Sequence, residues 1–226
     1  MTHERPADAR DMFAVHTMFR REYSMMPGLV RAVTAGDRPR LTVVADHIAL
    51  MNQVLHGHHM AEDTHIWPLL LERVDAELTA IVSVMEDQHE RIHQGYVRLD
   101  TALASWRKSA SAHDRDAVAE VLDALLPLLD EHLALEEARV VPLIERHLTA
   151  EEYARVAEEG AAHTPPDAFA VVFGMVMYEG DPEVIAGIMA RMPADVRPTI
   201  RDVATAAYAT YAQRLYGIAM PPRVLA

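Results

Sequence analysis

One pattern of histidine, acidic residues and proline occurs twice in the chain, at an offset of 74 residues. The first copy runs from His58 to Pro68 and the second from His132 to Pro142. In each copy Glu follows His by four residues, a second acid follows that Glu directly, and Pro closes the motif, as H-x-x-x-E-[D/E]-x-x-x-x-P. A single His-x-x-x-Glu pair arises easily by chance, but the same register found twice indicates a duplicated unit.

The segments that precede these two copies match each other as well, at an offset of 73 residues. Each has a His, a basic or imidazole side chain four residues later and a Tyr seven residues later: His16, Arg20 and Tyr23 in the first, and His89, His93 and Tyr96 in the second. The repeated unit is therefore a pair of helices. Two such pairs with pseudo-two-fold symmetry would bring four marked helices around one axis.

Strand signals are nearly absent from the sequence. Ala, Leu, Glu, Arg and Met dominate, and no Asn-Gly or Asp-Gly turn joins two alternating β-branched runs. Long helices are expected over about residues 8–35, 39–67, 75–109 and 113–146, with a kink or break of the first at Pro27-Gly28. Short connections between long helices favour an all-α fold built on an up-down-up-down four-helix bundle.

The last third of the chain has shorter helical segments. The spacing from Thr149 to Glu152 is that of a capping box and predicts the start of a fifth helix, which Pro165-Pro166 ends. Three further helices are expected over residues 167–179, 182–191 and 195–217. We therefore divide the chain into a bundle, residues 1–148, and a helical extension packed on it, residues 149–226.

Charge and cysteine content narrow the class of partner and metal site. With 34 acidic and 21 basic residues the formal net charge is −13, so nucleic acid is not expected as a partner. The chain has no cysteine, so any metal must be held by nitrogen and oxygen atoms. The amino terminus lacks a secretory signal, and the longest uncharged apolar run, residues 168–178, has 11 residues, too few to span a membrane. We expect a cytoplasmic protein.

The spacing within the repeat predicts a metal centre. Residues four apart lie on one helical face, about 6 Å apart at Cβ, so a His and a Glu so placed reach the same metal pair. Polar side chains gathered in a bundle core are costly unless they are hydrogen-bonded or coordinated. The side chains expected at this level are His16, His58, Glu62, His89, His93, His132 and Glu136.

The repeated motif resembles the hemerythrin-like, or HHE cation-binding, family over about residues 10–147. The resemblance implies a four-helix domain that holds two iron ions (Fe2+/Fe3+), joined by carboxylates and by an oxo or hydroxo bridge. By matching position, one iron would be bound by His89, His93 and His132, and the other by His16 and His58. Glu62 and Glu136 would bridge the two.

The resemblance also implies which small molecules the centre would meet. Because Arg20 occupies the place equivalent to His93, the second iron would keep an open position for a diatomic ligand or peroxide. The H-x-x-x-E spacing on the last helix is one residue shorter than the H-x-x-x-x-D of the invertebrate oxygen carriers. It is similar to that of the bacterial repair-type and iron-sensing relatives, although this chain lacks the cysteine-bearing domain of the repair type.

Two alternatives for the ligand set stay open in the sequence. Glu137 has the longer spacing from His132 and would substitute for Glu136, and a shift of one residue in the second helix would make His59 and Asp63 the inward pair. Zinc or manganese would suit the same ligands. Tyr23 and Tyr96 lie on the ligand faces, either as core aromatics or as hydroxyl donors or radical-forming phenols near the irons.

Three functions fit these observations, and whether the protein is an enzyme is open. The first is a di-iron protein that binds or reacts with O2, peroxide or nitric oxide. The second is a non-enzymatic oxygen or iron sensor or carrier, and the third is a helical bundle for partner binding with vestigial histidines. Residues 149–226 would cap the open iron, mediate a homodimer or shape a pocket for an organic substrate.

Overall fold

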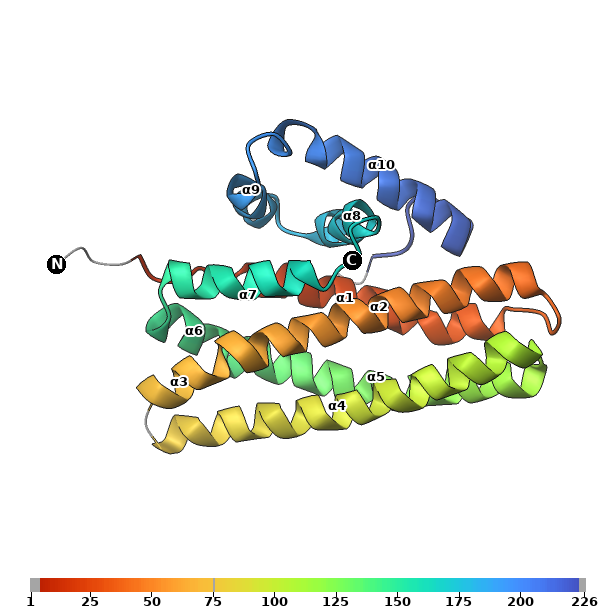
Figure 1. Cartoon of the computed structure of the whole chain (residues 1–226), viewed down its shortest axis with the longest axis horizontal. Helices are drawn as coiled ribbons and strands as arrows, with labels where there is room; N and C mark the ends of the chain where they lie inside the picture. The colour runs from red at the N-terminus through yellow and green to blue at the C-terminus, as the bar shows by residue number, and fades with distance from the viewer. Residues whose placement is uncertain (1–4, 75, 224–226) are drawn as a thin grey trace.

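The computed structural model describes residues 5–74 and 76–223, and it confirms the all-α class in those residues (Figure 1). Its helices are α1 (Asp11–Arg31), α2 (Arg38–His65), α3 (Trp67–Arg73), α4 (Ala76–Ser109), α5 (Ala112–Arg139), α6 (Val141–His147), α7 (Ala150–Ala162), α8 (Phe169–Glu179), α9 (Pro182–Arg191) and α10 (Arg197–Tyr216). The described residues form no β-strand, only one isolated bridge between Pro6 and Thr149. None of the described helices is long and apolar enough to cross a membrane.

Each copy of the repeat ends in a short helix that the sequence did not predict as separate. α3 follows α2 after Ile66, and α6 follows α5 after Val140. Pro68 and Pro142 are the second residues of these short helices, where the missing proline N–H breaks no intrahelical hydrogen bond. The expected helix over 39–67 therefore ends close to the end of α2 and leaves α3 unpredicted, whereas the expected helix over 113–146 is divided just before Pro142.

Pro27 does not break α1, which continues to Arg31. Met26 and Val30 are fully buried on either side of it, so core packing holds this last part of the helix although proline removes one hydrogen bond. The expected start of the third long helix, Asp75, lies outside the described residues.

The four long helices α1, α2, α4 and α5 lie side by side (Figure 1). α4 packs along α5, α1 packs against α5, and α2 contacts both α1 and α4. At one end the Gly36 N–H donates to the Ala110 carbonyl at 2.9 Å, and Gly36 has a φ of +84°, which glycine adopts without steric cost. At the other end Arg73 of α3 donates to the carbonyl of His147 of α6 at 2.8 Å.

α7 begins at the predicted capping box. The Thr149 hydroxyl accepts from the Glu152 N–H at 3.2 Å, and the Glu152 carboxylate accepts from the Thr149 N–H at 2.9 Å. This cap starts α7, which lies along α2. A segment far from α2 in the sequence thus covers the helix that carries the first copy of the repeat.

α8, α9 and α10 form a further layer beside α1 and α2 (Figure 1). Their apolar side chains join the same buried cluster as those of the long helices, with Val172 and Met175 of α8 in one cluster with Phe19 of α1. Gly174 permits the close approach of α8 to α10, because a Cβ there would lie 2.3 Å from the Ala204 carbonyl oxygen. The apolar core of this layer is therefore continuous with the core of the four long helices.

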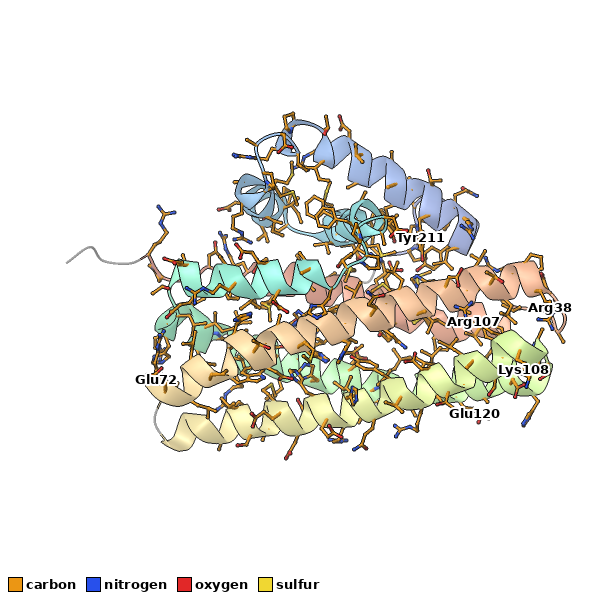
Figure 2. The ribbon with its side chains drawn as sticks, viewed as in Figure 1. Arg38, Glu72, Arg107, Lys108, Glu120 and Tyr211 are labelled. Carbon is orange, nitrogen blue, oxygen red and sulfur yellow. The ribbon has the colours of Figure 1, made fainter. Side chains whose placement is uncertain are left out.

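Buried charges also join this layer to α1. Arg21 donates to Glu179 of α8 at 2.6 Å and to the neighbouring Glu22 at 2.8 Å, and the side chains of Arg21 and Glu22 are fully buried. Tyr208 of α10 donates to Glu22 at 3.1 Å. Tyr211 lies where α10 faces α2 (Figure 2), with its hydroxyl 3.1 Å from Nδ1 of a buried histidine, His47.

Candidate metal centre

Side chains from all four long helices meet in the core as two groups that share Glu62. Within each group one donor atom of every residue lies within 4.8 Å of the others. The groups are His16, His58, Glu62 and Glu136 (the two-histidine group) and His59, Glu62, His89 and His132 (the three-histidine group). Every residue expected from the sequence belongs to one of them except His93.

The two-histidine group is drawn from α1, α2 and α5. The Nε2 atoms of His16 and His58 are 3.2 Å apart, and His58 Nε2 lies 3.0 Å from Glu62 Oε1. His16 Nε2 is 3.5 Å from Glu136 Oε2. The ring of Phe19 lies 5.4 Å from that of His58, centroid to centroid, and places an apolar wall beside the imidazole.

The three-histidine group is drawn from α2, α4 and α5. His89 Nε2 lies 3.5 Å from Glu62 Oε2, and the ring centroids of His59 and His132 are 4.9 Å apart. His132 Nε2 is 3.6 Å from Glu136 Oε2, the same oxygen that His16 approaches. Glu62 and Glu136 therefore each face imidazoles of both groups.

His59 takes the place that the sequence analysis gave to His93. His58 and His59 precede Glu62 by four and three residues, so both lie on the Glu62 side of α2. His93 is exposed on α4, with its ring 5.6 Å from that of the exposed His56. The buried face of α4 includes the fully buried Ile92, so the next residue, His93, lies on the exposed face of the helix.

Buried donor atoms without a hydrogen-bond partner gather at this centre. At the centre they are Nε2 of His59, His89 and His132 and both carboxyl oxygens of Glu62 and Glu136, and the one other such atom in the described residues is Nε2 of His47. The 3.0 Å approach of His58 to Glu62 is short but does not make a well-aligned hydrogen bond. Each such atom costs about 1–3 kcal/mol in a protein interior. Imidazole nitrogens and carboxylate oxygens suit iron, zinc and manganese, so the residues present fit a metal pair.

Burial shifts the titration of these side chains in opposite directions. It lowers the pKa of His58 to about 4 and lowers the pKa of His16 and His59 as well. It raises the pKa of the carboxyl groups of Glu62 and Glu136 above the usual range. Neutral imidazoles are ready to coordinate, while the two carboxyl groups need a cation to hold their negative charge in this interior.

Acceptors outside the centre hold the other nitrogen of three imidazoles. Nδ1 of His16 lies 3.0 Å from Glu137, Nδ1 of His89 lies 2.7 Å from Asp63, and Nδ1 of His132 lies 3.2 Å from Gln88. This leaves Nε2 of each ring directed at the carboxylates. Asp63 and Glu137, weighed from the sequence as alternative ligands, lie in neither group. Their shared place after the repeated Glu is the sequence signal for this outer role.

The two repeated tyrosines differ in their distance from the centre. The Tyr96 hydroxyl lies 3.5 Å from His59 Nδ1, whereas the Tyr23 hydroxyl donates to Asn52 at 3.0 Å. Both phenols are buried, and burial raises the pKa of each. Of these two tyrosines, only Tyr96 has its hydroxyl within hydrogen-bonding distance of an imidazole of the two groups.

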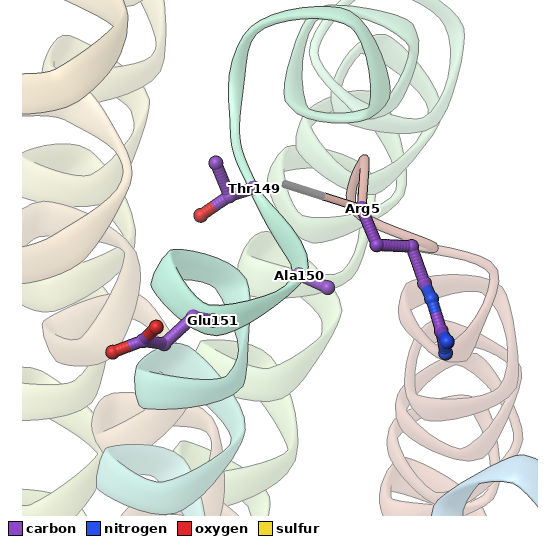
Figure 3. Close-up of a pocket in the computed structure, with 4 residues that line it drawn as sticks. All are labelled: Arg5, Thr149, Ala150 and Glu151. Carbon is purple, nitrogen blue, oxygen red and sulfur yellow. The ribbon is translucent and has the colours of Figure 1, made fainter. Parts of the chain in front are cut away.

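A surface pocket lies elsewhere, at the start of α7 (Figure 3). It has a volume of about 280 Å³ and is lined by Arg5, Thr149, Ala150 and Glu151. None of these residues belongs to the two groups in the core.

Curated relatives and one protein family match the chain. Two uncharacterized proteins, one of Mycobacterium tuberculosis and one of Mycobacterium bovis, are each 26% identical to the chain over 152 residues. The match covers 66% of this chain and 57% of each relative, so the chain spans less than two thirds of their length. No solved structure shows a significant match. The hemerythrin HHE cation-binding domain matches residues 8–144, and the chain belongs to that family.

Proposed function

We propose that the chain is a non-haem di-iron protein that binds or reacts with O2, peroxide or nitric oxide. The observation that carries the proposal is the set of unpartnered Nε2 and carboxyl oxygen atoms that face one another in the core. The arrangement of α1, α2, α4 and α5 supports an up-down-up-down bundle as the metal-binding unit, residues 1–148. Residues 149–226 would then be an extension packed on it.

The ligand set we propose follows the two groups. His59, His89 and His132 would hold one iron, His16 and His58 would hold the other, and Glu62 and Glu136 would bind both. The carboxyl oxygens support the bridging role because each Glu approaches imidazoles of both groups. His93 is not part of this set.

A bound iron pair would supply the one-electron steps and the open coordination position that a small ligand needs. The protein side chains have their own parts. Asp63, Glu137 and Gln88 hold Nδ1 of three imidazoles so that Nε2 faces the centre. Phe19 and Trp67 lie against His58 and His89 and exclude water from the two groups. The two-histidine group has fewer imidazoles and is where we place the small ligand.

The test is the visible absorption of the iron-loaded protein before and after addition of O2, hydrogen peroxide or nitric oxide. We expect the absorption bands of a di-iron centre, and we expect at least one of the three molecules to change them. Stopped-flow mixing with excess substrate then separates catalysis from binding, since an enzyme consumes many equivalents per centre. An iron-loaded protein whose spectrum responds to none of the three contradicts the proposal.

A second candidate function, a non-enzymatic sensor or carrier, has its own structural support. α1 carries His16 toward the centre and, five and six residues later, the buried Arg21 and Glu22 that contact α8 and α10. A shift of α1 on metal loading would therefore reach the carboxy-terminal layer. A sensor predicts that iron loading changes protease cleavage over residues 150–166, which lead into α8. Equal cleavage of apo and loaded protein speaks against it.

A further inference from the structure

His16 and His89, which occupy equivalent places in the repeat, are each held by an acid from the other half of the repeat. Nδ1 of His16 on α1 lies 3.0 Å from Oε1 of Glu137 on α5. Nδ1 of His89 on α4 lies 2.7 Å from Oδ1 of Asp63 on α2. Asp63 and Glu137 are themselves equivalent, one residue after the repeated Glu. The two contacts are thus a symmetric pair.

The second donor to each acid breaks this symmetry. Arg20 donates two hydrogen bonds to Glu137, at 2.6 Å to Oε1 and 3.1 Å to Oε2. Asp63 instead accepts from the neutral indole N–H of Trp67 at 2.7 Å. Within the described residues, no Arg or Lys forms an ion pair with Asp63. One acid is therefore neutralised by a guanidinium and the other keeps its negative charge.

The different donors to Glu137 and Asp63 come from positions at which the two halves of the repeat have different residues. Arg20 stands where the second half has His93, which points outward. Trp67 stands where the second half has Val141, whose side chain has no N–H to donate. Both halves keep the acid and the histidine, so the divergence changes only the charge around an otherwise repeated contact.

The charge of that acid affects how strongly the imidazole binds a cation. A carboxylate that accepts from Nδ1–H makes the opposite nitrogen a better donor, and removal of such an outer partner typically costs about 10–100-fold in metal affinity. A guanidinium paired with the carboxylate opposes that effect. Asp63 is 43% exposed and Glu137 18%, so water screens part of the Asp63 charge but does not cancel it.

We infer that Arg20 is a positioning residue that makes the ion of the two-histidine group the more weakly held and more easily reduced of the pair. It acts through Glu137 and His16 and does not touch the centre itself. The inference rests on the proposed function, because it requires two metal ions in the two groups. Arg20 would thus make the two ions differ in affinity and potential, in addition to the effect of the different number of histidines on each.

The experiment compares the full chain with Arg20→Met, which removes the charge, and Arg20→Lys, which keeps it. The chain is loaded with Fe2+ without oxygen, and release to an excess of a coloured Fe2+ chelator is followed in time. We expect two phases in the parent protein and a faster phase slowed by about tenfold in Arg20→Met. Arg20→Lys should release iron as the parent protein does. In spectroelectrochemistry, with one electron per iron from the electrode, only Arg20→Met should lower the higher of two reduction potentials.

Arg31→Met is the matched control, since Arg31 also lies on α1 and pairs with an acid of α5, Asp123, away from the centre. It should change neither phase. Circular dichroism checks that each variant folds. If the parent protein binds two ions but Arg20→Met alters neither phase nor potential, or alters both ions equally, the inference about Arg20 is wrong while the proposed function stands. If the parent protein binds no iron, both are wrong.

Discussion

The imidazoles of His59 and His89 stack face to face, with ring centroids 4.2 Å apart and 17° between their planes. One ring comes from α2 and the other from α4, and Nε2 of each has no hydrogen-bond partner within the described residues. Two parallel rings that present free nitrogens to the same space are suited to one cation. This relationship makes His59, rather than His93, the third imidazole of its group.

Substitution of these histidines distinguishes the two assignments. We expect His59→Ala to lower the iron affinity of the three-histidine group by at least about tenfold, because one of three imidazoles is lost. His93→Ala should leave iron binding unchanged, since its side chain is exposed beside His56. Iron content after dialysis against a weak chelator measures both effects.

His113→Ala is a suitable control, because His113 is exposed near the start of α5. It reports any effect of losing an imidazole from the surface. The assignment is contradicted if His93→Ala loses iron and His59→Ala retains it.

The repeat explains why so much of the centre was accessible from sequence. A motif found twice in one register predicted the four long helices and the inward side chains His16, His58, Glu62, His89, His132 and Glu136. It also predicted His93, four residues after His89, and considered His59 only in place of His58. Whether His93 faces the core depends on the rotation of α4, which the burial of Ile92 and Tyr96 sets.

The contacts of the last third of the chain were less predictable. Capping and proline signals gave the helix starts, as at Thr149, because these are local. The pairing of Arg21 with Glu179 joins residues 158 positions apart, and no local pattern reports it. Likewise, the sequence marked Arg20 as an asymmetry of the repeat but did not identify Glu137 as its partner.

Gly57 allows the end of α7 to lie on α2 next to His58. A Cβ at Gly57 would be 2.3 Å from Cβ of His163, and Gln53 holds the same residue by donating to its carbonyl at 2.9 Å. We expect Gly57→Ala to destabilise the fold by about 1–3 kcal/mol, because the backbone must move to relieve the overlap. Urea denaturation measures the change.

Gly28→Ala provides the comparison, since a Cβ there meets nothing within 4 Å and the residue is helical. It should stabilise the protein by roughly 0.5–1 kcal/mol, as alanine is the better helix former. Equal effects of the two substitutions would mean that the contact of Gly57 with His163 is not close in solution.

His47 should make the attachment of the carboxy-terminal layer sensitive to acid. Burial lowers its pKa from 6.5 to about 4, while Glu22 opposes and Arg21 adds to that shift. Tyr211 and Tyr216 of α10 face the same ring. The pKa of His47 is lower in the folded protein than in the unfolded chain. Its contribution to stability is therefore complete above pH 6.5 and is lost as the pH falls from 6.5 to 4.

The measurement is the free energy of unfolding as a function of pH for the parent chain and for His47→Gln. A fall of the pKa from 6.5 to about 4 is worth roughly 3 kcal/mol, so the parent chain should lose up to about that much more stability than the variant between pH 6.5 and 4. Parallel pH profiles of the two proteins would show that His47 does not titrate in this way.

Metal content tests the existence of the centre most directly. Glu62→Gln with Glu136→Gln keeps the size of both side chains and resembles the protonated carboxyl groups that burial favours, so the metal-free fold should survive. We predict about two iron ions per chain in the reconstituted parent protein by elemental analysis and well under one in the double variant, because no carboxylate is left to join the pair. Unchanged iron content in a folded double variant would contradict the carboxylate-bridged centre.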